Sequence, residues 1–255
     1  MPDHLAIPTS VSDPWAGLRE FTAARIALGR SGVSVPLRAA LDFRLAHAHA
    51  RDAVYSTLET APLLAAIAGL QQPALQVHSR AGTREQYLQR PEYGRQLADD
   101  SATRLAAAAT DETDLIVVLA DGLSATAVNE HAAPLLARLL PPLRAAGLRL
   151  GPIVLAEQAR VALGDAVGQL LRARLVLVLI GERPGLSAPH SLGAYLTFAP
   201  RPGLTDEARN CVSNIRPEGL PYPAAADRLV YLLSAALRRQ LSGVALKDDS
   251  PPLLG

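Results

Sequence analysis

Cysteine is nearly absent from this chain of 255 residues, which has only Cys211. A single cysteine excludes a disulfide within the chain. It also excludes any zinc or iron–sulfur site that takes several thiolates from this chain. Cysteine usage therefore places no constraint on the redox compartment, and a reducing cytoplasm is the expected location.

Long apolar runs are also missing. The most apolar segments, 115–120 and 175–180, are six residues each, whereas a helix that crosses a bilayer needs about 20 apolar residues. No basic flank followed by an apolar stretch occurs at the N-terminus, so the sequence predicts no membrane span and no secretory signal. Residues 1–12 are polar and contain proline, and they are predicted to be flexible.

Charge of either sign is sparse. Charged residues make up 19 % of the chain, and 25 basic residues nearly balance 24 acidic ones, giving a net charge of +1. This balance argues against a protein that binds nucleic acid or an anionic membrane through bulk charge. Hydrophobic residues make up 49 % and can form a sizeable core. Alanine-rich helices would dilute the charge, and so would a surface that a partner covers.

Residues 13–110 are predicted to be mainly helical. One helix is expected from the N-cap Asp13 to the residue before Gly29, and a second over 36–57. Shorter helices over 61–70 and 87–109 should flank a strand at 75–79, with an interruption near Pro91 and Gly94. Apolar residues at helical spacing predict a buried face on each of the first two helices: Leu18, Phe21, Ala24 and Leu28, then Leu37, Leu41, Leu45 and Ala48.

Residues 111–255 show a different pattern, in which short β-rich apolar runs alternate with helical segments. This alternation predicts an α/β domain with a Rossmann-like, doubly wound, mostly parallel sheet. The strands are expected at 115–120, 152–155, 175–180 and 194–198, and the helices at 132–146, 165–171 and 223–241. Pro141 and Pro142 are expected to interrupt the first of these helices.

Ligands of such a sheet bind beyond the carboxyl ends of the strands, where the chain topology reverses. Three loops qualify: 121–124, 160–164 and 181–186. Gly122, Gly181 and Gly185 would let the backbone approach a ligand, or they are ordinary tight strand exits. None of the loops has the glycine pattern of a dinucleotide site or a P-loop, so nucleotide binding has no specific support.

Metal-binding and nucleophilic patterns are weak. Two of the histidines, His47 and His49, are two residues apart on an expected helix and would point to different faces. The others considered have no recognisable acidic or cysteine companions, so hydrogen-bonded structural roles are expected: His78, His131 and His190. No carboxylate pair is placed for acid–base work. The side-chain chemistry alone indicates a binding domain rather than a self-sufficient catalyst.

Five segments of the chain form a recognisable pattern in this order: 87–95, 121–125, 179–186, 191–195 and 209–216. The most specific parts are Gly181-Glu182-Arg183-Pro184-Gly185-Leu186 and Asn210-Cys211-Val212-Ser213-Asn214-Ile215. Together these segments closely resemble the small subunit (light chain) of ethanolamine ammonia-lyase, and the likeness extends from about residue 24 to residue 244.

This resemblance implies a subunit of an adenosylcobalamin-dependent lyase that converts ethanolamine to acetaldehyde and ammonia. In that family a large TIM-barrel subunit carries out the radical chemistry, and the α/β domain of the small subunit, here residues 111–255, closes on the cobalamin at the interface of a hetero-oligomer. The cofactor contacts carry over to Val161, Glu182 and Cys211. Val161 would form an apolar wall, Glu182 would accept hydrogen bonds, and Cys211 would be a packing contact or backbone donor rather than a cobalt ligand.

Two departures from the family pattern affect these expectations. Ala159 stands where relatives often have glycine before the Arg160-Val161 pair, so a slightly different approach of the backbone to the cofactor is expected there. Residues 1–12 contain no amphipathic extension of the kind linked to bacterial microcompartments, so free cytoplasm is expected. A free-standing α/β enzyme with a nucleotide cofactor and a structural or regulatory subunit without cofactor contact remain the alternatives.

Overall fold

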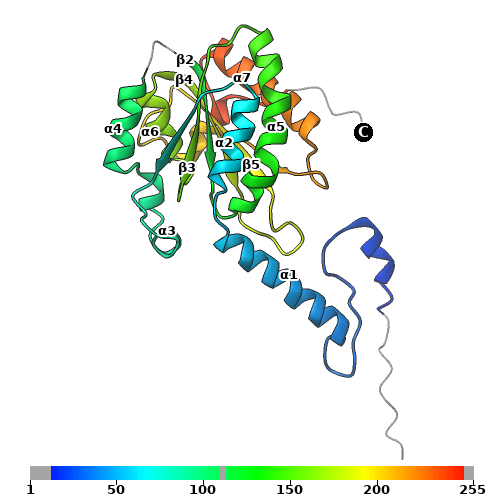
Figure 1. Ribbon diagram of the computed structural model, residues 1–255. Helices are drawn as coiled ribbons and strands as arrows, with labels where there is room; N and C mark the ends of the chain where they lie inside the picture. The colour runs from blue at the N-terminus through cyan, green and yellow to red at the C-terminus, as the bar shows by residue number, and fades with distance from the viewer. Residues whose placement is uncertain (1–12, 110–112, 250–255) are drawn as a thin grey trace, which may run out of the picture.

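A computed structural model of the chain describes residues 13–109 and 113–249 (Figure 1). The expectation of a flexible segment at 1–12 lies outside these residues. The helices are α1 (Leu37–Tyr55), α2 (Thr60–Gly69), α3 (Arg84–Gln89), α4 (Asp99–Ala108), α5 (Ala125–Ala145), α6 (Leu163–Leu170) and α7 (Tyr222–Arg239). The strands are β1 (Ala74–His78), β2 (Thr113–Ala120), β3 (Leu150–Glu157), β4 (Ala173–Gly181), β5 (Leu192–Phe198) and β6 (Arg209–Ile215). Short 3-10 helices occur at Ala16–Phe21, Tyr93–Arg95, Asp206–Ala208 and Gly243–Ala245.

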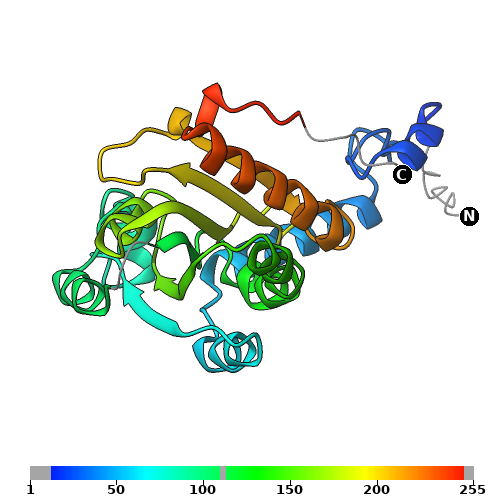
Figure 2. The same cartoon turned by 90° about the horizontal axis from the view of Figure 1, so that it is seen from above.

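The strands form one mixed sheet in the order β1-β3-β2-β4-β5-β6, with helices on both faces (Figure 2). Side chains of β2 alternate between the faces. Leu115, Val117 and Leu119 pack with α2, α5 and α7, while Ile116 and Val118 pack with α4 and α6. A central strand covered on both faces is expected to be apolar on both, which explains the uninterrupted apolar run of β2 over residues 115–120. The predicted α/β fold with a mostly parallel sheet is confirmed.

Two strand pairs depart from the parallel pattern. The pairs β1–β3, β3–β2 and β2–β4 are parallel, whereas β5 runs antiparallel to both β4 and β6. Residues 182–191 join β4 to β5 without a helix. Since a parallel partner needs a long crossover that brings the chain back to the starting edge, this short connection imposes antiparallel pairing. The strand β6 lies in a segment for which the sequence pattern predicted no strand.

Helix α5 is longer than expected and keeps its prolines inside. It begins at Ala125, where the hydroxyl of Ser124 accepts a hydrogen bond from the amide of Ala127. The predicted interruption at Pro141 and Pro142 is wrong. A proline inside a helix costs about 3 kcal/mol, but a fully buried leucine contributes about 1.5–3 kcal/mol. Several leucines of α5 are buried against the sheet and offset that cost: Leu135, Leu136, Leu139, Leu140 and Leu143.

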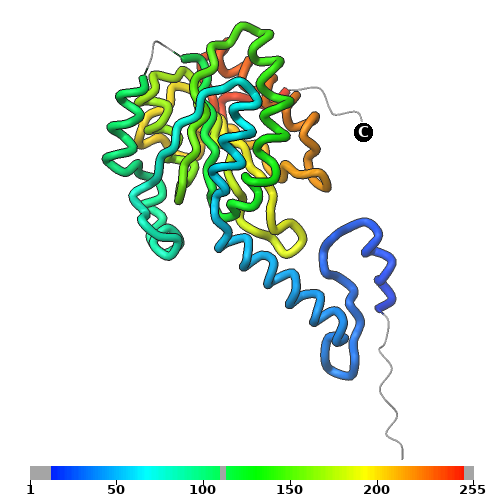
Figure 3. Tube along the Cα trace, in the orientation of Figure 1, coloured from blue at the N-terminus to red at the C-terminus, as the bar shows by residue number. Residues whose placement is uncertain are grey.

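Residues 13–55, called the arm below, project from the α/β domain (Figure 3). The helix predicted over 13–28 is wrong, because only Ala16–Phe21 forms a 3-10 helix there. Helix α1 is confirmed, but its predicted buried face is not. Leu37, Leu41 and Leu45 are 74, 52 and 57 % exposed, and Phe21 is 85 % exposed. Apolar residues at helical spacing do form a stripe on α1, but the described part of the chain leaves it uncovered.

The region between the arm and β2 belongs to the sheet domain. Strand β1, from the region predicted to be mainly helical, pairs with β3 along its whole length. Leu63 and Ile67 of α2 and Leu105 of α4 are buried in the two cores. Within the described residues, no helix is both long enough and apolar enough to cross a membrane.

Asp114 gives the amino end of β2 a pH-dependent contribution to stability. Its carboxylate accepts hydrogen bonds from Arg149 and Arg174 at 3.1 Å. The hydrogen bonds from Arg149 lower the pKa of Asp114 from 3.8 to about 2, against the effect of burial. A depressed folded-state pKa stabilises the protein above pH 4, and this stabilisation is lost as the pH falls through 2. Because Arg149 is half exposed, solvent weakens the interaction, and we expect the stabilisation to amount to about 1–2 kcal/mol.

The variant Asp114→Asn should therefore lower the free energy of unfolding by about 1–2 kcal/mol at pH 7. The difference from the unmodified chain should shrink as the pH falls from 5 to about 2. Urea unfolding across this range measures it. Asp227→Asn, an exposed aspartate on α7, is the matched control and should change little. A difference for Asp114→Asn that is constant with pH would contradict this assignment.

Candidate functional site

An open cleft of about 500 Å³ lies at the carboxyl ends of the parallel strands. Each of the three loops singled out in the sequence contributes to it, since residues at or just after the ends of β2, β3 and β4 all line the cleft. These are Gly122 and Leu123 after β2, Arg160, Val161 and Ala162 after β3, Ile180 and Gly181 at the end of β4, and Glu182 and Arg183 after it. Tyr87, Arg95, Tyr195 and Asp206 complete the lining. The expected position of the site at the switch point of the sheet is therefore the position of the cleft.

Two glycines form the floor of the cleft through contact with each other's loops. The amide of Leu123 donates to the carbonyl of Gly181 at 3.0 Å. A Cβ at Gly181 would lie 1.9 Å from the carbonyl oxygen of Ser124, and one at Gly122 would lie 2.3 Å from that of Gly181. These glycines let two strand exits pack together, which is the second of the two sequence interpretations. A Cβ added at Gly185 would meet no atom closer than 3.7 Å, so this glycine is not required by a close contact.

Asp121 holds the loops after β2 and β3 together beneath the cleft. Its carboxylate accepts hydrogen bonds from the amides of Gly122, Gln158 and Ala159 at 2.8–2.9 Å. Burial raises the pKa of Asp121 to about 6, although these amides and Arg84 favour the charged form. Both carboxylate oxygens are engaged, so Asp121 acts as a structural clamp.

Tyr87, a buried residue of α3, lines one side of the cleft. Its ring lies between two guanidinium groups, with Arg84 4.7 Å and Arg160 4.6 Å from the ring centre. Its hydroxyl donates to the carbonyl of Ala159 at 3.3 Å. Burial and the negative charge of Asp121 raise the pKa of Tyr87 to about 12, so the phenol stays neutral. The stack fixes the position of Arg160 on the cleft wall.

Glu182 stands at the start of the loop between β4 and β5. Its Oε2 accepts hydrogen bonds from the hydroxyl of Ser191 at 2.5 Å and from the amide of Asn214 at 3.2 Å. Asn214 reaches this position with a left-handed backbone, φ 57°. Both contacts use Oε2, which leaves Oε1 able to accept a hydrogen bond from a molecule in the cleft. Glu182 is thus held in place by one oxygen and available through the other.

The other two predicted contacts, Val161 and Cys211, differ in their relation to the cleft. Val161 lines the cleft together with Glu182, and its side chain is half-buried. Cys211 is exposed and lies opposite Tyr195 in the β5–β6 register, so the two side chains share one face of the sheet. Partial burial raises the pKa of the Cys211 thiol, which keeps it protonated at neutral pH. The cleft contains Val161 and Glu182, and Cys211 lies next to one of its walls.

Comparison with known proteins identifies the family. The family model described as ethanolamine ammonia-lyase light chain (EutC) matches residues 12–247. The chain is 55 % identical over 246 residues to the ethanolamine ammonia-lyase small subunit of Pseudomonas fluorescens strain Pf-5. The aligned region covers 95 % of this chain and 90 % of that protein. This chain belongs to the ethanolamine ammonia-lyase light-chain family. The small subunit of Ralstonia nicotianae strain GMI1000 is also 55 % identical, over 96 % of this chain and 93 % of its own length.

Membership of the light-chain family confirms the resemblance seen in the sequence. Four cleft residues were not singled out from the sequence: Tyr87, Arg95, Tyr195 and Asp206. Three of them begin or end segments that carry the resemblance, since Tyr87 and Arg95 bound 87–95 and Tyr195 ends 191–195. Their place in a family-specific segment was the available signal. Nothing in their spacing indicated that they would face the loops after β2, β3 and β4.

Proposed function

We propose that this light chain forms one side of an adenosylcobalamin site that it shares with the large subunit of ethanolamine ammonia-lyase. The observation that supports this most directly is the pairing of Val161 with Glu182 in one open cleft at the strand ends. Among the described residues only Oε2 of Glu182 accepts a hydrogen bond, which leaves Oε1 for a ligand, and Val161 and Ile180 offer apolar surface. An apolar lining with a few fixed polar groups is typical of cofactor sites.

The chemistry of the cleft suits a corrin. The apolar lining matches the face of a large ring, and Glu182 and Asp206 can accept hydrogen bonds from amide side chains. Arg95, Arg160 and Arg183 supply donors, and the Nε of Arg160 is buried with no hydrogen-bond partner among the described residues. A buried donor left without a partner costs free energy, and a ligand in the cleft could relieve that cost.

The light chain has the role of a platform in this proposal. When bound, adenosylcobalamin supplies the radical that the conversion of ethanolamine to acetaldehyde and ammonia requires. The side chains of the light chain orient the cofactor and exclude water from one side of it. Asp121 beneath the cleft and Tyr87 in its lining are both held by hydrogen bonds to the backbone, so both are assigned structural roles. The substrate and its chemistry belong to the large subunit.

The arm supplies the surface for that large subunit. Most of the exposed large apolar side chains among the described residues lie in residues 13–55, on the 3-10 helix, the following loop and α1. The arm also reaches the cleft, because Arg25 donates to the carbonyl of Leu186 at 3.2 Å in the loop that begins with Glu182. Large apolar patches of this kind mark protein interfaces. A partner that covers the arm would therefore also lie beside the cleft.

Replacing Glu182 with alanine tests the cofactor contact. The change removes a hydrogen-bond acceptor, so the Kd for adenosylcobalamin of the complex with the large subunit should rise about tenfold, or ~1–1.5 kcal/mol. Equilibrium dialysis of the complex measures this. Glu182→Gln keeps one acceptor oxygen and should give a smaller effect. Glu85→Ala, which removes an exposed carboxylate on α3 outside the cleft lining, is the matched control.

The two alternatives give different results in the same experiment. Unchanged cofactor affinity in both Glu182 variants would favour a structural or regulatory subunit. Ammonia release from ethanolamine by this chain alone would favour a free-standing enzyme. The proposed function predicts that cofactor retention and ammonia release both require the mixture with the large subunit.

A further inference from the structure

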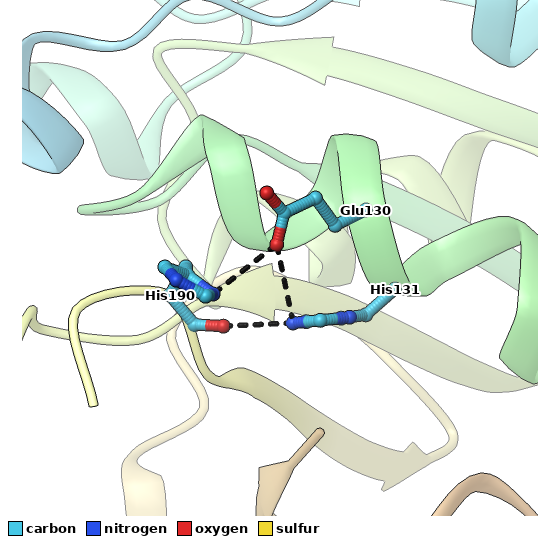
Figure 4. Close-up of side chains that lie close together, drawn as sticks. All are labelled: Glu130, His131 and His190. Carbon is cyan, nitrogen blue, oxygen red and sulfur yellow. Dashed lines mark hydrogen bonds and ion pairs between the residues drawn. The ribbon is translucent and has the colours of Figure 1, made fainter. Parts of the chain in front are cut away.

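The side chains of Glu130, His131 and His190 lie close together (Figure 4), and none of them lines the cleft. Two of them are neighbours on α5, and His190 lies near the end of the loop between β4 and β5. The Oε2 of Glu130 lies 3.1 Å from Nδ1 of His190 and 3.7 Å from Nε2 of His131. The sequence analysis gave these histidines separate structural roles. That interpretation missed Glu130, which directly precedes His131, because the loop brings in the third member.

The distances in this group resemble those between ligands of one ion. Two ligands of a tetrahedral zinc ion, each about 2.0–2.1 Å from the metal, are about 3.4 Å apart. The Nδ1 of His190 is buried and makes no hydrogen bond among the described residues, although Oε2 of Glu130 lies 3.1 Å away. Two polar atoms close together without hydrogen-bond geometry are arranged as co-ligands would be. All three potential ligand atoms lie within 4.8 Å of one another.

His131 is the fixed member of the group. Its ring is buried, with Nδ1 2.9 Å from the hydroxyl of Tyr222 and Nε2 2.9 Å from the carbonyl of His190. The carbonyl of His190 can only accept, so Nε2 donates to it and Nδ1 accepts from the Tyr222 hydroxyl. A metal ion at Nε2 would replace this hydrogen bond, and the proton would move to Nδ1, which would then donate to the Tyr222 hydroxyl. Metal-binding histidines are oriented in this way by an outer partner on the second ring nitrogen.

We propose that Glu130, His131 and His190 form a binding site for a divalent first-row transition-metal ion, with Zn²⁺ as the best match. Two imidazoles and one carboxylate are ligands that Zn²⁺ prefers, and they leave one position of a tetrahedral ion open to water. The side chains of Glu130 and His190 are 48 and 41 % exposed, so an ion can enter from solvent. A bound ion would tie α5 to the loop that begins with Glu182.

Binding of Co²⁺ and Zn²⁺ to the full chain, with any affinity tag removed, tests this site. Co²⁺ reports its ligands by visible absorption, and Zn²⁺ should displace it. We expect saturation at one ion per chain and a rise in Tm with Zn²⁺, since an ion bound only by the folded state stabilises it. Loss of an outer-sphere partner typically weakens metal binding about tenfold. Glu130→Gln and His190→Ala each remove a direct ligand, so each should weaken binding by more than that.

Matched controls come from a second histidine–carboxylate pair. His78 lies 3.1 Å from Asp100 and has no second histidine beside it. His78→Ala and Asp100→Asn should leave the stoichiometry and affinity unchanged. Circular dichroism of each metal-free variant shows whether it folds, and Tyr222→Phe gives a variant that keeps all three ligands and should bind about tenfold more weakly. Uptake that does not saturate at one ion per chain, or that His78→Ala reduces as much as His190→Ala, would overturn the proposal.

Discussion

A chain that carries both Leu37→Asp and Leu41→Asp should bind the large subunit about a thousandfold more weakly than the unmodified chain. The two side chains lie one turn apart on α1 and are 74 and 52 % exposed. Burying each leucine in an interface contributes about 2 kcal/mol, so losing both removes about 4 kcal/mol. The charges add to this loss, because an aspartate buried without a partner is unfavourable. Titration of the large subunit with each chain, followed by calorimetry, measures the affinity.

Because these leucines are exposed, the experiment separates an effect on binding from an effect on folding. They contribute little to the fold of the described chain, so the double variant should unfold at the same urea concentration as the unmodified chain. Val244→Asp is the control, because Val244 is 70 % exposed and lies outside the arm. It should bind the large subunit normally. Equal affinity of the double variant and the unmodified chain would show that the apolar stripe of α1 is not an interface.

Asp165→Ala should lower the free energy of unfolding by about 3–5 kcal/mol. The carboxylate of Asp165 and the guanidinium of Arg209 form two parallel hydrogen bonds of 2.6 and 2.7 Å, and both side chains are almost completely buried. Removal of Asp165 leaves the charge of Arg209 buried beside Thr197 with only weaker partners. The pair joins α6 to the start of β6, the strand that carries Cys211. Urea unfolding at pH 7 measures the loss.

A double variant distinguishes lost pairing from lost packing. Asp165→Leu combined with Arg209→Met removes both charges and keeps apolar volume, so it should be more stable than Asp165→Ala alone. Asp100→Ala, which removes an exposed ion pair with Arg104, should cost no more than about 1 kcal/mol. A cost for Asp165→Ala as small as that of Asp100→Ala would contradict the importance of the buried pair.

The sequence predicts the elements of this fold best where both faces of an element are buried. Strand β2 is apolar at nearly every position because helices cover both faces of the sheet, and its range was predicted within two residues. The arm was mispredicted for the opposite reason. The stripe of Leu37, Leu41 and Leu45 has the spacing of a buried helix face, but spacing does not reveal whether the covering surface belongs to the same chain. The prolines of α5 show that tertiary burial can outweigh a local preference.

The sequence predicted where the candidate site lies in the sheet but not the full set of side chains that line it. Strand order brings the loops after β2, β3 and β4 to one edge, so the position of Val161 and Glu182 followed from topology. Tyr195 and Cys211 come from antiparallel strands whose register the apolar pattern does not specify. The group of Glu130, His131 and His190 depends on the conformation of the loop 182–191, which no sequence pattern predicts.

The contact between Gly122 and Gly181 limits how this site can change during evolution or engineering. Main chain touches main chain there, so any side chain larger than hydrogen at either glycine would separate the two strand exits. The floor of the cleft is thus closed to substitution, and new ligand preferences would have to arise at its rim. Arg183 and Val161 stand there on loops with room around them, and a library confined to such positions would vary recognition while preserving the scaffold.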